Sequence, residues 1–338
     1  MPRSVRPRPK VFVTRLIDPS AFARLRASAA VTVWPGDMPP PASALRAGLT
    51  DADAVLSMIT DKLDARMISD APRLRVISNL GVGVDNIDLD AATSTGIAVG
   101  HTPGVLTDAT ADLAFGLLMA TARRIAEGDR YVRAGEWRTW GPTTLLGHDV
   151  HSSTIGIIGF GAIGQAMALR GTGFGMRVLY LKRPSSKPIE RRLAGAVGVT
   201  LRRLLAESDY VSLHAPLTAR TRHMIGAREF ARMKPGAILI NTSRGAVVDQ
   251  AAMVAALKSG HLGGAGLDVT DPEPIAPRDP ILRLDKVVIT PHIGSASIAT
   301  RAKMAAIAVD NILDVFAGHL PRQCANPQVR LRGESTAT

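Results

Sequence analysis

The sequence of 338 residues holds a single cysteine, Cys324, few aromatic residues and no long apolar run. One cysteine excludes an internal disulfide framework and fits a reducing compartment, so we expect a cytoplasmic protein. The longest apolar stretch, residues 113–122, is well short of the roughly 20 residues that a membrane span needs. The basic opening, MPRSVRPRPK, is followed by no apolar run of the signal-peptide kind, so we expect no secretory signal.

Acidic residues are also scarce, with 29 Asp and Glu against 41 Lys and Arg and a net charge of +12. Such a balance can indicate nucleic-acid binding. Here the basic residues are scattered without a long basic run, and aromatic residues make up only 4% of the chain. We therefore expect attraction of small anions, and no nucleic-acid or membrane partner.

Short β-branched runs alternate with segments of helical length, from KVFVTRL at 10–16 to KVVITPH at 286–292. This alternation predicts βαβ units and parallel sheets. Several runs are apolar throughout, which is typical of strands covered on both faces. Because ten such runs are many for one small sheet, we predict two α/β domains.

Two longer helical patterns stand out. Residues 107–137 are predicted to form one long helix, whose nearly all-round apolar stretch needs covering, and a partner subunit is a candidate. The last helical pattern, roughly 296–317, is predicted to end at Gly318. From about residue 327 the tail is polar and is predicted to be disordered.

A glycine fingerprint, TIGIIGFGAIGQAMA at 154–168, lies between an apolar run and a helical pattern. Gly159 permits the tight turn, Gly161 lets a pyrophosphate approach the backbone, and Gly164 lets helix and strand pack closely. The helix N-terminus then offers N–H groups to the anion. A bare G-x-G-x-x-G is weak evidence, but this strand–turn–helix context predicts a dinucleotide site.

The carboxylate that usually follows such a fingerprint is missing. In NAD sites an acid at the end of the second strand accepts hydrogen bonds from the ribose 2′-OH. Here VLYLKRPSSK at 178–187 offers Lys182, Arg183 and Ser185 instead. Cationic and hydroxyl donors suit a 2′-phosphate, which predicts NADP(H), with NAD as the weaker alternative. The competing interpretation is a solvated basic loop.

Polar residues follow three later strand candidates. Arg244 lies in INTSRGAVVD (240–249), Asp268 and Glu273 lie in GLDVTDPEP (266–274), and His292 lies in ITPHIGSAS (289–297). In open α/β sheets the ligand crevice lies outside the carboxyl ends of the strands, so these segments can converge. Arginine can bind a 2-oxo acid bidentately, histidine can pass a proton to a ketone oxygen, and glutamate can orient the histidine ring. Taken singly, each could be an ordinary surface residue.

The chain resembles the D-isomer-specific 2-hydroxyacid dehydrogenases over about residues 10–327. The motifs that carry the resemblance are the fingerprint, GVLTDATADLAFGLLMATARR (104–124), HAPLTARTRHMI (214–225), NTSRGAVVD (241–249), GLDVTDPEP and PHIGSAS (291–297). The resemblance implies that Arg244 anchors the substrate, that His292 is the acid/base and that Glu273 is its partner. Asp268 would contact the nicotinamide carboxamide.

Cofactor contacts are implied along the same motifs. They fall at Gly159, Gly161, Ala162, Ile163, Gly164, Lys182, Arg183, Ser185, Ala215, Pro216, Thr221, Thr242, Ser243, Asp268, His292 and Gly294. Ala162 departs from the family, since many relatives carry arginine there. No metal site is expected, because His148 and His151 lie in a polar segment without matching acids or cysteines.

Within the family, VISNLGVGVDNIDL (76–89) and PHIGSAS are most similar to the glyoxylate/hydroxypyruvate reductase branch. The resemblance implies that backbone N–H groups at Leu80, Gly81, Val82 and Gly83 hold the substrate carboxylate, with Arg244, His292 and Ser295 also at the substrate. Trp140 would either close a small active site, from within its own chain or across a dimer interface, or simply pack in a dimer.

The sequence thus predicts a Rossmann cofactor domain, 104–295, inserted in a discontinuous flavodoxin-like substrate domain, 1–103 and 296–338. We expect NADPH-dependent reduction of glyoxylate or hydroxypyruvate by a homodimer formed through the 104–150 region. The alternatives are an NAD-linked dehydrogenase of phosphoglycerate or D-lactate type and a dinucleotide-sensing, corepressor-like binding protein.

Overall fold

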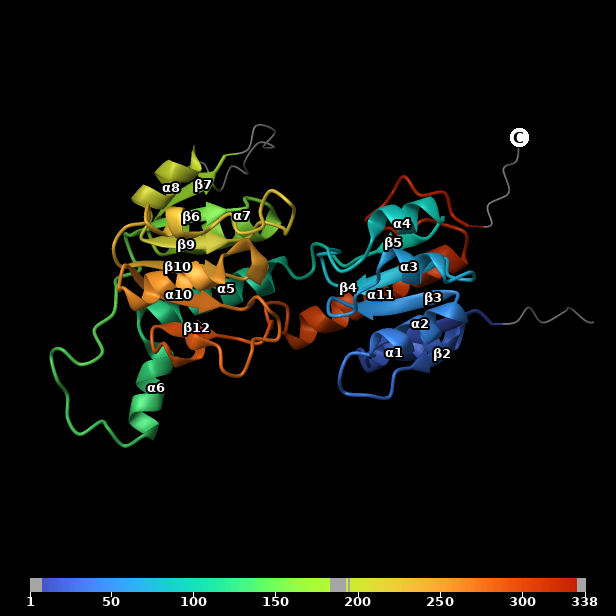
Figure 1. Ribbon diagram of the computed structural model, residues 1–338, viewed down its shortest axis with the longest axis horizontal. Coiled ribbons are helices and arrows are strands. Elements are labelled where there is room, and N and C mark those ends of the chain that lie inside the picture. The colour runs from blue at the N-terminus through green and yellow to red at the C-terminus, as the bar shows by residue number, and fades with distance from the viewer. Residues whose placement is uncertain (1–7, 183–192, 194, 333–338) are drawn as a thin grey trace, which may run out of the picture. The chain divides into compact units, whose positions relative to one another are not determined.

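The computed structural model describes residues 8–182, 193 and 195–332 (Figure 1). The chain divides into two compact units. The first unit comprises Met1–Leu106 and Ala296–Thr338, and the second is the continuous stretch Thr107–Ser295. The second unit is therefore inserted into the sequence of the first. The assignment of substrate to the first unit and cofactor to the second stays a prediction.

The first unit is built on a five-stranded parallel sheet. Its strands are β1 (Lys10–Val13), β2 (Ala30–Val33), β3 (Ala54–Met58), β4 (Val76–Leu80) and β5 (Ala98–Gly100). Their order is β2-β1-β3-β4-β5, and every neighbouring pair is parallel. This is the flavodoxin-like order, in which the chain reverses direction between β1 and β3.

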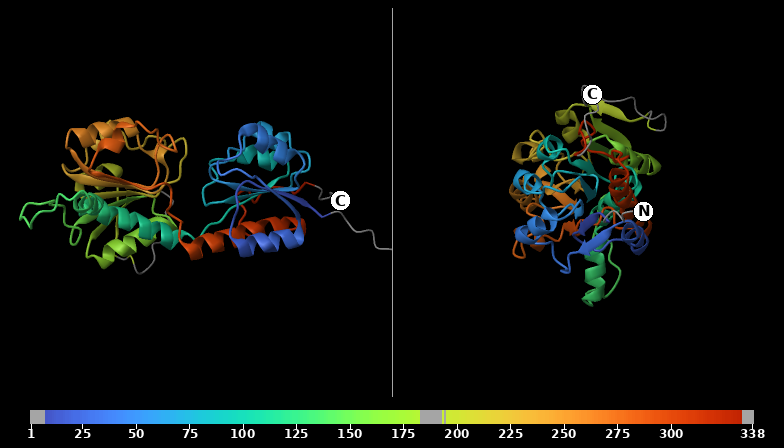
Figure 2. Two further views of the ribbon diagram at one scale, coloured as in Figure 1. Left: turned by 90° about the horizontal axis from the view of Figure 1, so that it is seen from below. Right: turned by 90° about the vertical axis from the view of Figure 1, so that its right-hand side faces the viewer.

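Helices cover both faces of this sheet (Figure 2). They are α1 (Pro19–Ser28), α2 (Ala42–Thr50), α3 (Ala65–Ser69), α4 (Leu89–Ser94) and α11 (Ile298–Phe316). One core cluster joins α1 and α11 to the sheet, and a second joins α2, α3 and α4 to it. Because both faces are covered, β3 and β4 are apolar along most of their length.

The second unit has a seven-stranded parallel sheet. Its strands are β6 (Thr154–Ile158), β7 (Arg177–Leu181), β8 (Val197–Val199), β9 (Tyr210–Leu213), β10 (Ala237–Asn241), β11 (Leu262–Leu267) and β12 (Val287–Ile289). The order β12-β11-β10-β9-β6-β7-β8 is that of a Rossmann sheet, with the reversal between β6 and β9. The prediction of two doubly wound parallel sheets is confirmed.

Helices also lie on both faces of the second sheet. They are α5 (Thr107–Ala122), α6 (Ile125–Arg133), α7 (Ala162–Gly173), α8 (Leu201–Glu207), α9 (Ala227–Phe230) and α10 (Gln250–Lys258), with short 3-10 turns at Gly245–Val247 and Pro280–Arg283. One core cluster packs α5 and α7 on the sheet, and another packs α8, α9 and α10 on its other face.

The single helix predicted over 107–137 is wrong, because α5 and α6 are separate. The returning segment meets the end of α5, where the N–H of His148 donates to the Ala122 carbonyl at 2.8 Å. In a continuing helix that carbonyl would accept from the residue four positions later. Arg124 adopts a left-handed conformation, with φ 53°, and redirects the chain into α6.

The end of the chain is better ordered than its composition predicts. Helix α11 begins after the Ser297 cap and is followed by Gly318 at φ 87°, close to the predicted limits. The prediction of disorder from residue 327 is wrong for 327–332, because Val329 and Leu331 are 5% exposed in the first unit. A helix long and apolar enough to cross a membrane is not found among the described residues.

Candidate active site

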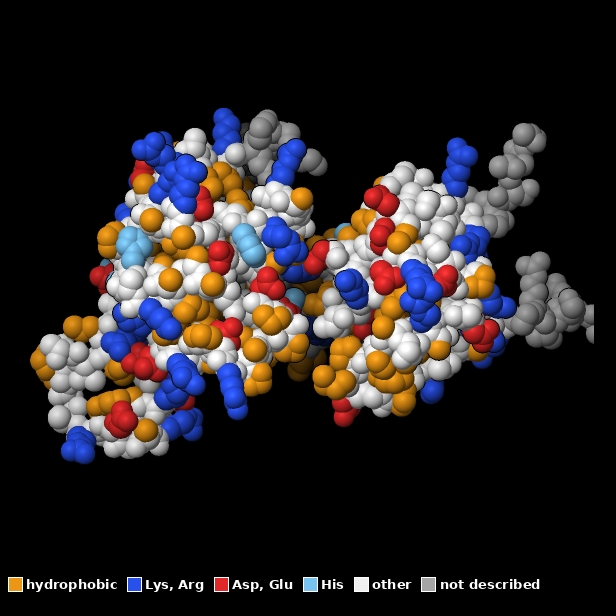
Figure 3. Space-filling view, in the orientation of Figure 1, with side chains coloured by type: hydrophobic (Ala, Val, Ile, Leu, Met, Phe, Trp, Pro, Cys, Tyr) orange, Lys and Arg blue, Asp and Glu red, His pale blue; other side chains and the backbone are white. Residues whose placement is uncertain are grey.

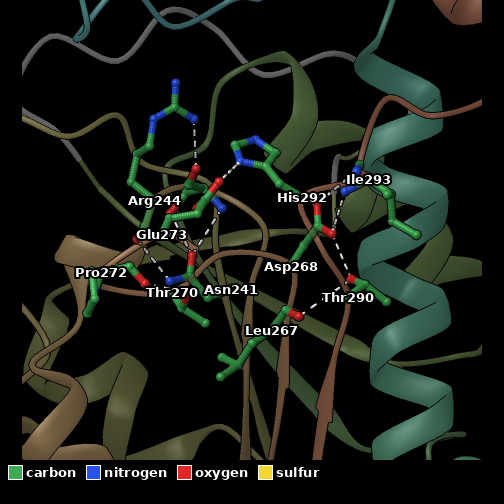
Figure 4. A network of polar contacts seen from close by, with 12 residues as sticks. Asn241, Arg244, Leu267, Asp268, Thr270, Pro272, Glu273, Thr290, His292 and Ile293 are labelled. Atoms are coloured by element: carbon green, nitrogen blue, oxygen red, sulfur yellow. Dashed lines mark hydrogen bonds and ion pairs between the residues drawn. The ribbon is translucent and has the colours of Figure 1, made fainter. Parts of the chain in front are cut away.

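The predicted trio lies at neighbouring strand ends of the second unit. Arg244 follows β10, Asp268 follows β11 directly, and His292 comes shortly after β12. These three strands are adjacent and parallel, so their carboxyl ends share one edge of the sheet. Figure 4 shows the side chains of Arg244, Glu273, Asp268 and His292 gathered there.

His292 and Glu273 are in direct contact. The Nδ1 atom of His292 lies 2.5 Å from Oε1 of Glu273, and the two side chains are 25% and 34% exposed. Because Nδ1 faces the carboxylate, the other ring nitrogen, Nε2, is left for a different partner. A histidine oriented through one nitrogen by a carboxylate is suited to exchange a proton through the other.

Asp268 holds the backbone that carries this histidine. Its carbonyl oxygen accepts from the N–H of His292 at 2.9 Å, and its carboxylate accepts from the N–H groups of Ile293 and Gly294 at 2.8 and 2.7 Å. The hydroxyl of Thr290 donates to the same carboxylate at 2.6 Å. Asp268 is only 2% exposed. These bonds fix His292 in a left-handed conformation, φ 54°, that a side chain other than glycine rarely adopts.

Asn241 organises the turn that carries Arg244. Its side-chain oxygen accepts from the backbone N–H of Ser243 at 3.0 Å and from the Ser243 hydroxyl at 2.8 Å, and its amide nitrogen donates to the Arg244 carbonyl at 2.9 Å. The Arg244 guanidinium donates to the Ser243 carbonyl at 2.9 Å. A Cβ at Gly245 would lie 1.9 Å from the Thr270 carbonyl oxygen. The Arg244 turn therefore packs tightly against the segment that leads to Glu273.

The glycine fingerprint forms the predicted strand–turn–helix between β6 and α7. Gly159 has φ 97°, and a Cβ there would lie 2.4 Å from the backbone nitrogen of Ala215. A Cβ at Gly164 would lie 2.1 Å from the Gly159 carbonyl oxygen, so this glycine permits close packing of helix on strand. A Cβ at Gly161 would meet nothing within 4 Å. With Ala162 and Ile163 opening α7, this open backbone at a helix N-terminus fits a pyrophosphate.

Other predicted cofactor residues lie on segments after β9 and β10. The Thr221 hydroxyl donates to the Pro216 carbonyl at 2.6 Å and accepts from the Thr218 N–H at 2.8 Å, which closes the loop after Ala215. Thr242 and Ser243 directly follow β10. These contacts show how the loops are held, and the cofactor contacts themselves stay predictions.

His214 is a polar residue of this edge that the sequence did not single out as a site. Its Nε2 lies 2.9 Å from the Ser212 hydroxyl, and its Nδ1 lies 3.4 Å from the Thr242 hydroxyl. Burial lowers the pKa of His214 to about 4. The ring is therefore neutral at neutral pH and joins the ends of β9 and β10. The one sequence feature that could have pointed to His214 is its position at the start of HAPLT, directly after a strand.

The predicted 2′-phosphate residues are only partly described. Lys182 directly follows β7 and is exposed, and its backbone N–H donates to the Val199 carbonyl at 3.0 Å. Arg183 and Ser185 lie outside the described residues. Of the predicted substrate residues, Leu80, Gly81, Val82 and Gly83 belong to the first unit, whereas Ser295 ends the second. Trp140 is 79% exposed in the segment that follows α6.

Comparisons with known proteins agree with this geometry. Residues 115–294 match the family model described as "D-isomer specific 2-hydroxyacid dehydrogenase, NAD binding domain". The chain is 48% identical over 323 residues to a glyoxylate reductase of Korarchaeum cryptofilum, which covers 95% of this chain and 97% of that protein.

Two solved structures extend the similarity to the fold. A Thermus thermophilus protein aligns with TM-score 0.88 and 47% identity, covering 94% of this chain and 99% of that one. An NADPH-dependent glyoxylate/hydroxypyruvate reductase of Sinorhizobium meliloti, solved with NADP and malonate, aligns with TM-score 0.85 and 32% identity, covering 96% and 99%.

Proposed function

Since the chain belongs to the D-isomer-specific 2-hydroxyacid dehydrogenase family, we propose that it reduces glyoxylate or hydroxypyruvate with NADPH. The observation that carries the proposal is the His292–Glu273 pair, which lies with Arg244 in the same unit as the glycine fingerprint. Support for the substrate class comes from the relatives, several of which are glyoxylate reductases. The product would be glycolate from glyoxylate and the D-2-hydroxy acid, D-glycerate, from hydroxypyruvate.

In the proposed reaction the chain's own residues bind, orient and protonate the substrate. When bound, a nicotinamide cofactor would supply the hydride for this reduction. His292 gives the proton from Nε2 to the ketone oxygen, while Glu273 keeps Nδ1 occupied and the ring oriented. Arg244 binds the oxo acid through its guanidinium, which matches a planar carboxylate and carbonyl.

The cofactor preference rests on charge at the end of β7. NAD sites place a carboxylate there, whereas this chain has Lys182 and then Arg183. Lys182 is exposed at the strand end, where it can meet an anionic group. A 2′-phosphate is the group that distinguishes NADP from NAD, so we assign NADPH as the preferred cofactor. We also infer a cytoplasmic enzyme, because its one cysteine, Cys324, is a free thiol.

We further propose a homodimer formed through the 104–150 region. Helix α6 and the segment after it extend away from the second sheet (Figure 1). Hydrophobic side chains lie at several places on this extension, with charged ones among them (Figure 3). They include Ile125, Val132, Trp137, Trp140 and Leu146, which are 52–79% exposed. Large apolar side chains exposed in one segment favour coverage by a second copy of the chain.

The activity is tested with purified protein, NADPH and a panel of 2-oxo acids. We expect the loss of NADPH absorbance with glyoxylate and hydroxypyruvate, and formation of D-glycerate from hydroxypyruvate. Pyruvate and 3-phosphohydroxypyruvate are the matched comparisons for the lactate and phosphoglycerate alternatives. Failure of every 2-oxo acid to oxidise NADPH or NADH would contradict the proposal and favour a dinucleotide-sensing role.

A further inference from the structure

The Leu80–Gly83 turn of the first unit is held through three consecutive carbonyl groups. The backbone N–H of Thr102 donates to the Gly81 carbonyl at 2.9 Å. Nδ1 of His101 lies 2.9 Å from the Val82 carbonyl oxygen, and Nδ2 of Asn79 donates to the Gly83 carbonyl at 2.9 Å. In a planar trans peptide the carbonyl and the following N–H point in opposite directions. Holding these carbonyls therefore turns the next N–H groups, those of Val82, Gly83 and Val84, the other way.

These N–H groups are available to a ligand. None of the three has a hydrogen-bond partner among residues 8–182, 193 and 195–332. Successive backbone N–H groups without internal partners can together bind an anion. The arrangement thus depends on His101 and Asn79, whose side chains hold two of the carbonyls.

We propose that His101 and Asn79 are positioning residues, which hold the carbonyls of Val82 and Gly83 and so aim the N–H groups of Gly83 and Val84 at the substrate carboxylate. The proposal rests on the proposed function, because it assigns that carboxylate to this turn. Neither residue was predicted as part of the site. Both act through the backbone of the turn, without touching the substrate.

Asn79 is fixed by a buried polar network at the ends of β3 and β4. It is fully buried, and its register partner on β3, Ser57, donates to its side-chain oxygen at 3.1 Å. The Asn86 amide lies within 3.4 Å of the same oxygen and donates to the carbonyls of Met58 and Asp61 at 3.1 and 2.9 Å. A buried amide needs such partners, since an unsatisfied polar group is costly. With its oxygen engaged, the nitrogen of Asn79 faces Gly83.

His101 is anchored on both sides of its own backbone. Its N–H donates to the Gln323 carbonyl at 3.0 Å, and its carbonyl accepts from the Asn311 amide at 3.1 Å. These two backbone hydrogen bonds leave the ring of His101 in contact with the Val82 carbonyl. Because a carbonyl only accepts hydrogen bonds, Nδ1 of His101 carries the proton in this contact.

The test compares two substitutions at His101 that differ in one donor. In His101→Asn the amide nitrogen takes the place of Nδ1, the same number of bonds from Cα, and can still donate to Val82. His101→Leu removes the donor and keeps an apolar side chain. His319→Leu, at an exposed histidine of the same unit, is the control. Thermal unfolding of each variant is measured alongside to confirm that it folds.

Two readouts separate positioning from folding and from cofactor binding. We expect His101→Leu to raise KM for glyoxylate about fivefold, the factor expected for one lost hydrogen bond, with kcat within about twofold of wild type. Calorimetric titration with oxamate, an unreactive 2-oxo acid analogue, should show the same loss of affinity. The affinity for NADPH should not change. His101→Asn and His319→Leu should behave as wild type.

The outcomes distinguish this inference from the proposed function. Wild-type KM and oxamate affinity in His101→Leu, or equal losses in the Leu and Asn variants, would overturn the positioning role while wild-type turnover stands. Oxamate binding that depends on His101 without turnover of any 2-oxo acid would overturn the function and keep the positioning role. If the protein showed no turnover of any 2-oxo acid and no binding of oxamate, both the proposed function and the positioning role would be overturned.

Discussion

His292 has two ring nitrogens with different surroundings. Nδ1 is bonded to Glu273, and three successive N–H groups from His292 to Gly294 are bonded to Asp268. The imidazole is thus held by one carboxylate through its ring and by another residue through its backbone. Rigid placement of a proton donor is what general acid catalysis requires.

We expect His292→Ala to lower kcat by about 10²- to 10⁴-fold, the usual contribution of a positioned acid or base. Glu273→Gln should lower kcat less, because an amide can still contact Nδ1. NADPH binding, followed by fluorescence, should persist in both variants. His151→Ala, at an exposed histidine of the same unit, is the matched control. Near-normal turnover of the His292 variant would remove this residue from the mechanism.

His214 makes stability depend on pH. Burial lowers its pKa from the ordinary 6.5 to about 4, so between these values the unfolded chain binds more protons than the folded one. The free energy of unfolding therefore rises with pH through this window and falls as the solution is acidified from about 6.5 toward 4. The contribution of one such group is on the order of 2–3 kcal/mol.

We expect His214→Gln to flatten this dependence. Urea unfolding at several values between pH 4 and pH 7 should show a smaller loss of stability on acidification in the variant than in wild type. The comparison isolates His214, because other titrating groups are common to both proteins. Parallel curves for the two proteins would show that His214 does not titrate with a depressed pKa.

The residues of the site differ in how far the sequence predicts them. Arg244, Glu273 and His292 are charged or titratable groups just past apolar runs, and that contrast is visible in the chain. Asn79, His101 and Asn241 act by hydrogen bonds to nearby carbonyl and N–H groups. Such bonds depend on turn geometry and follow no sequence period, so these residues escaped prediction.

Among the elements, the break between α5 and α6 shows a limit of helical periodicity. The sequence pattern continues through Arg124, but the tertiary contact of His148 with the Ala122 carbonyl ends α5. A contact made 26 positions along the chain cannot be found by a local pattern. The strands were predicted well because continuous apolar runs reflect burial on both faces.

The C-terminal segment is an element in which one buried side chain makes several of the anchoring contacts. Asn326 is 1% exposed; its oxygen accepts from the Val99 N–H at 2.8 Å, and its amide donates to Thr93 and to the Ile97 carbonyl at 3.0 Å. The Ala325 N–H donates to the Val99 carbonyl at 2.7 Å. The segment after α11 thereby pairs with β5. Its polar composition had suggested disorder from residue 327.

We expect Asn326→Ala to lower the free energy of unfolding by about 2–3 kcal/mol, because several buried polar groups lose their partner. Urea denaturation measures the change. The cofactor affinity should be unaffected, since the substitution lies in the first unit and the fingerprint in the second. Gln328→Ala, at an exposed position nearby, should cost little. Equal stability of the two variants would contradict the anchoring role of Asn326.

For the whole molecule, alternating strands and helices were enough to predict two parallel-sheet units. The resemblance to a family supplied the flavodoxin-like and Rossmann assignments, and the strand orders confirm them. The assembly cannot be predicted in the same way. An exposed apolar surface indicates that a partner covers it, but the pattern of one chain does not give the symmetry.

We expect the protein to be a dimer and Val132→Asp to weaken the dimer. A charge on the exposed face of α6 would be buried without a partner in the interface. Light scattering coupled to size exclusion, run over a range of concentrations, measures the mass. Leu320→Asp, a matched exposed apolar position of the first unit, should leave the mass unchanged. A monomeric wild type at every concentration would contradict the proposed assembly.

The most direct test of the function is a comparison of the two cofactors with one substrate. Purified protein is assayed with hydroxypyruvate and either NADPH or NADH, and kcat/KM is measured for each cofactor. We expect D-glycerate to form and kcat/KM to be higher with NADPH, because Lys182 and Arg183 replace the carboxylate of NAD sites. A higher kcat/KM with NADH, or no D-glycerate with either cofactor, would contradict an NADPH-dependent 2-oxo acid reductase.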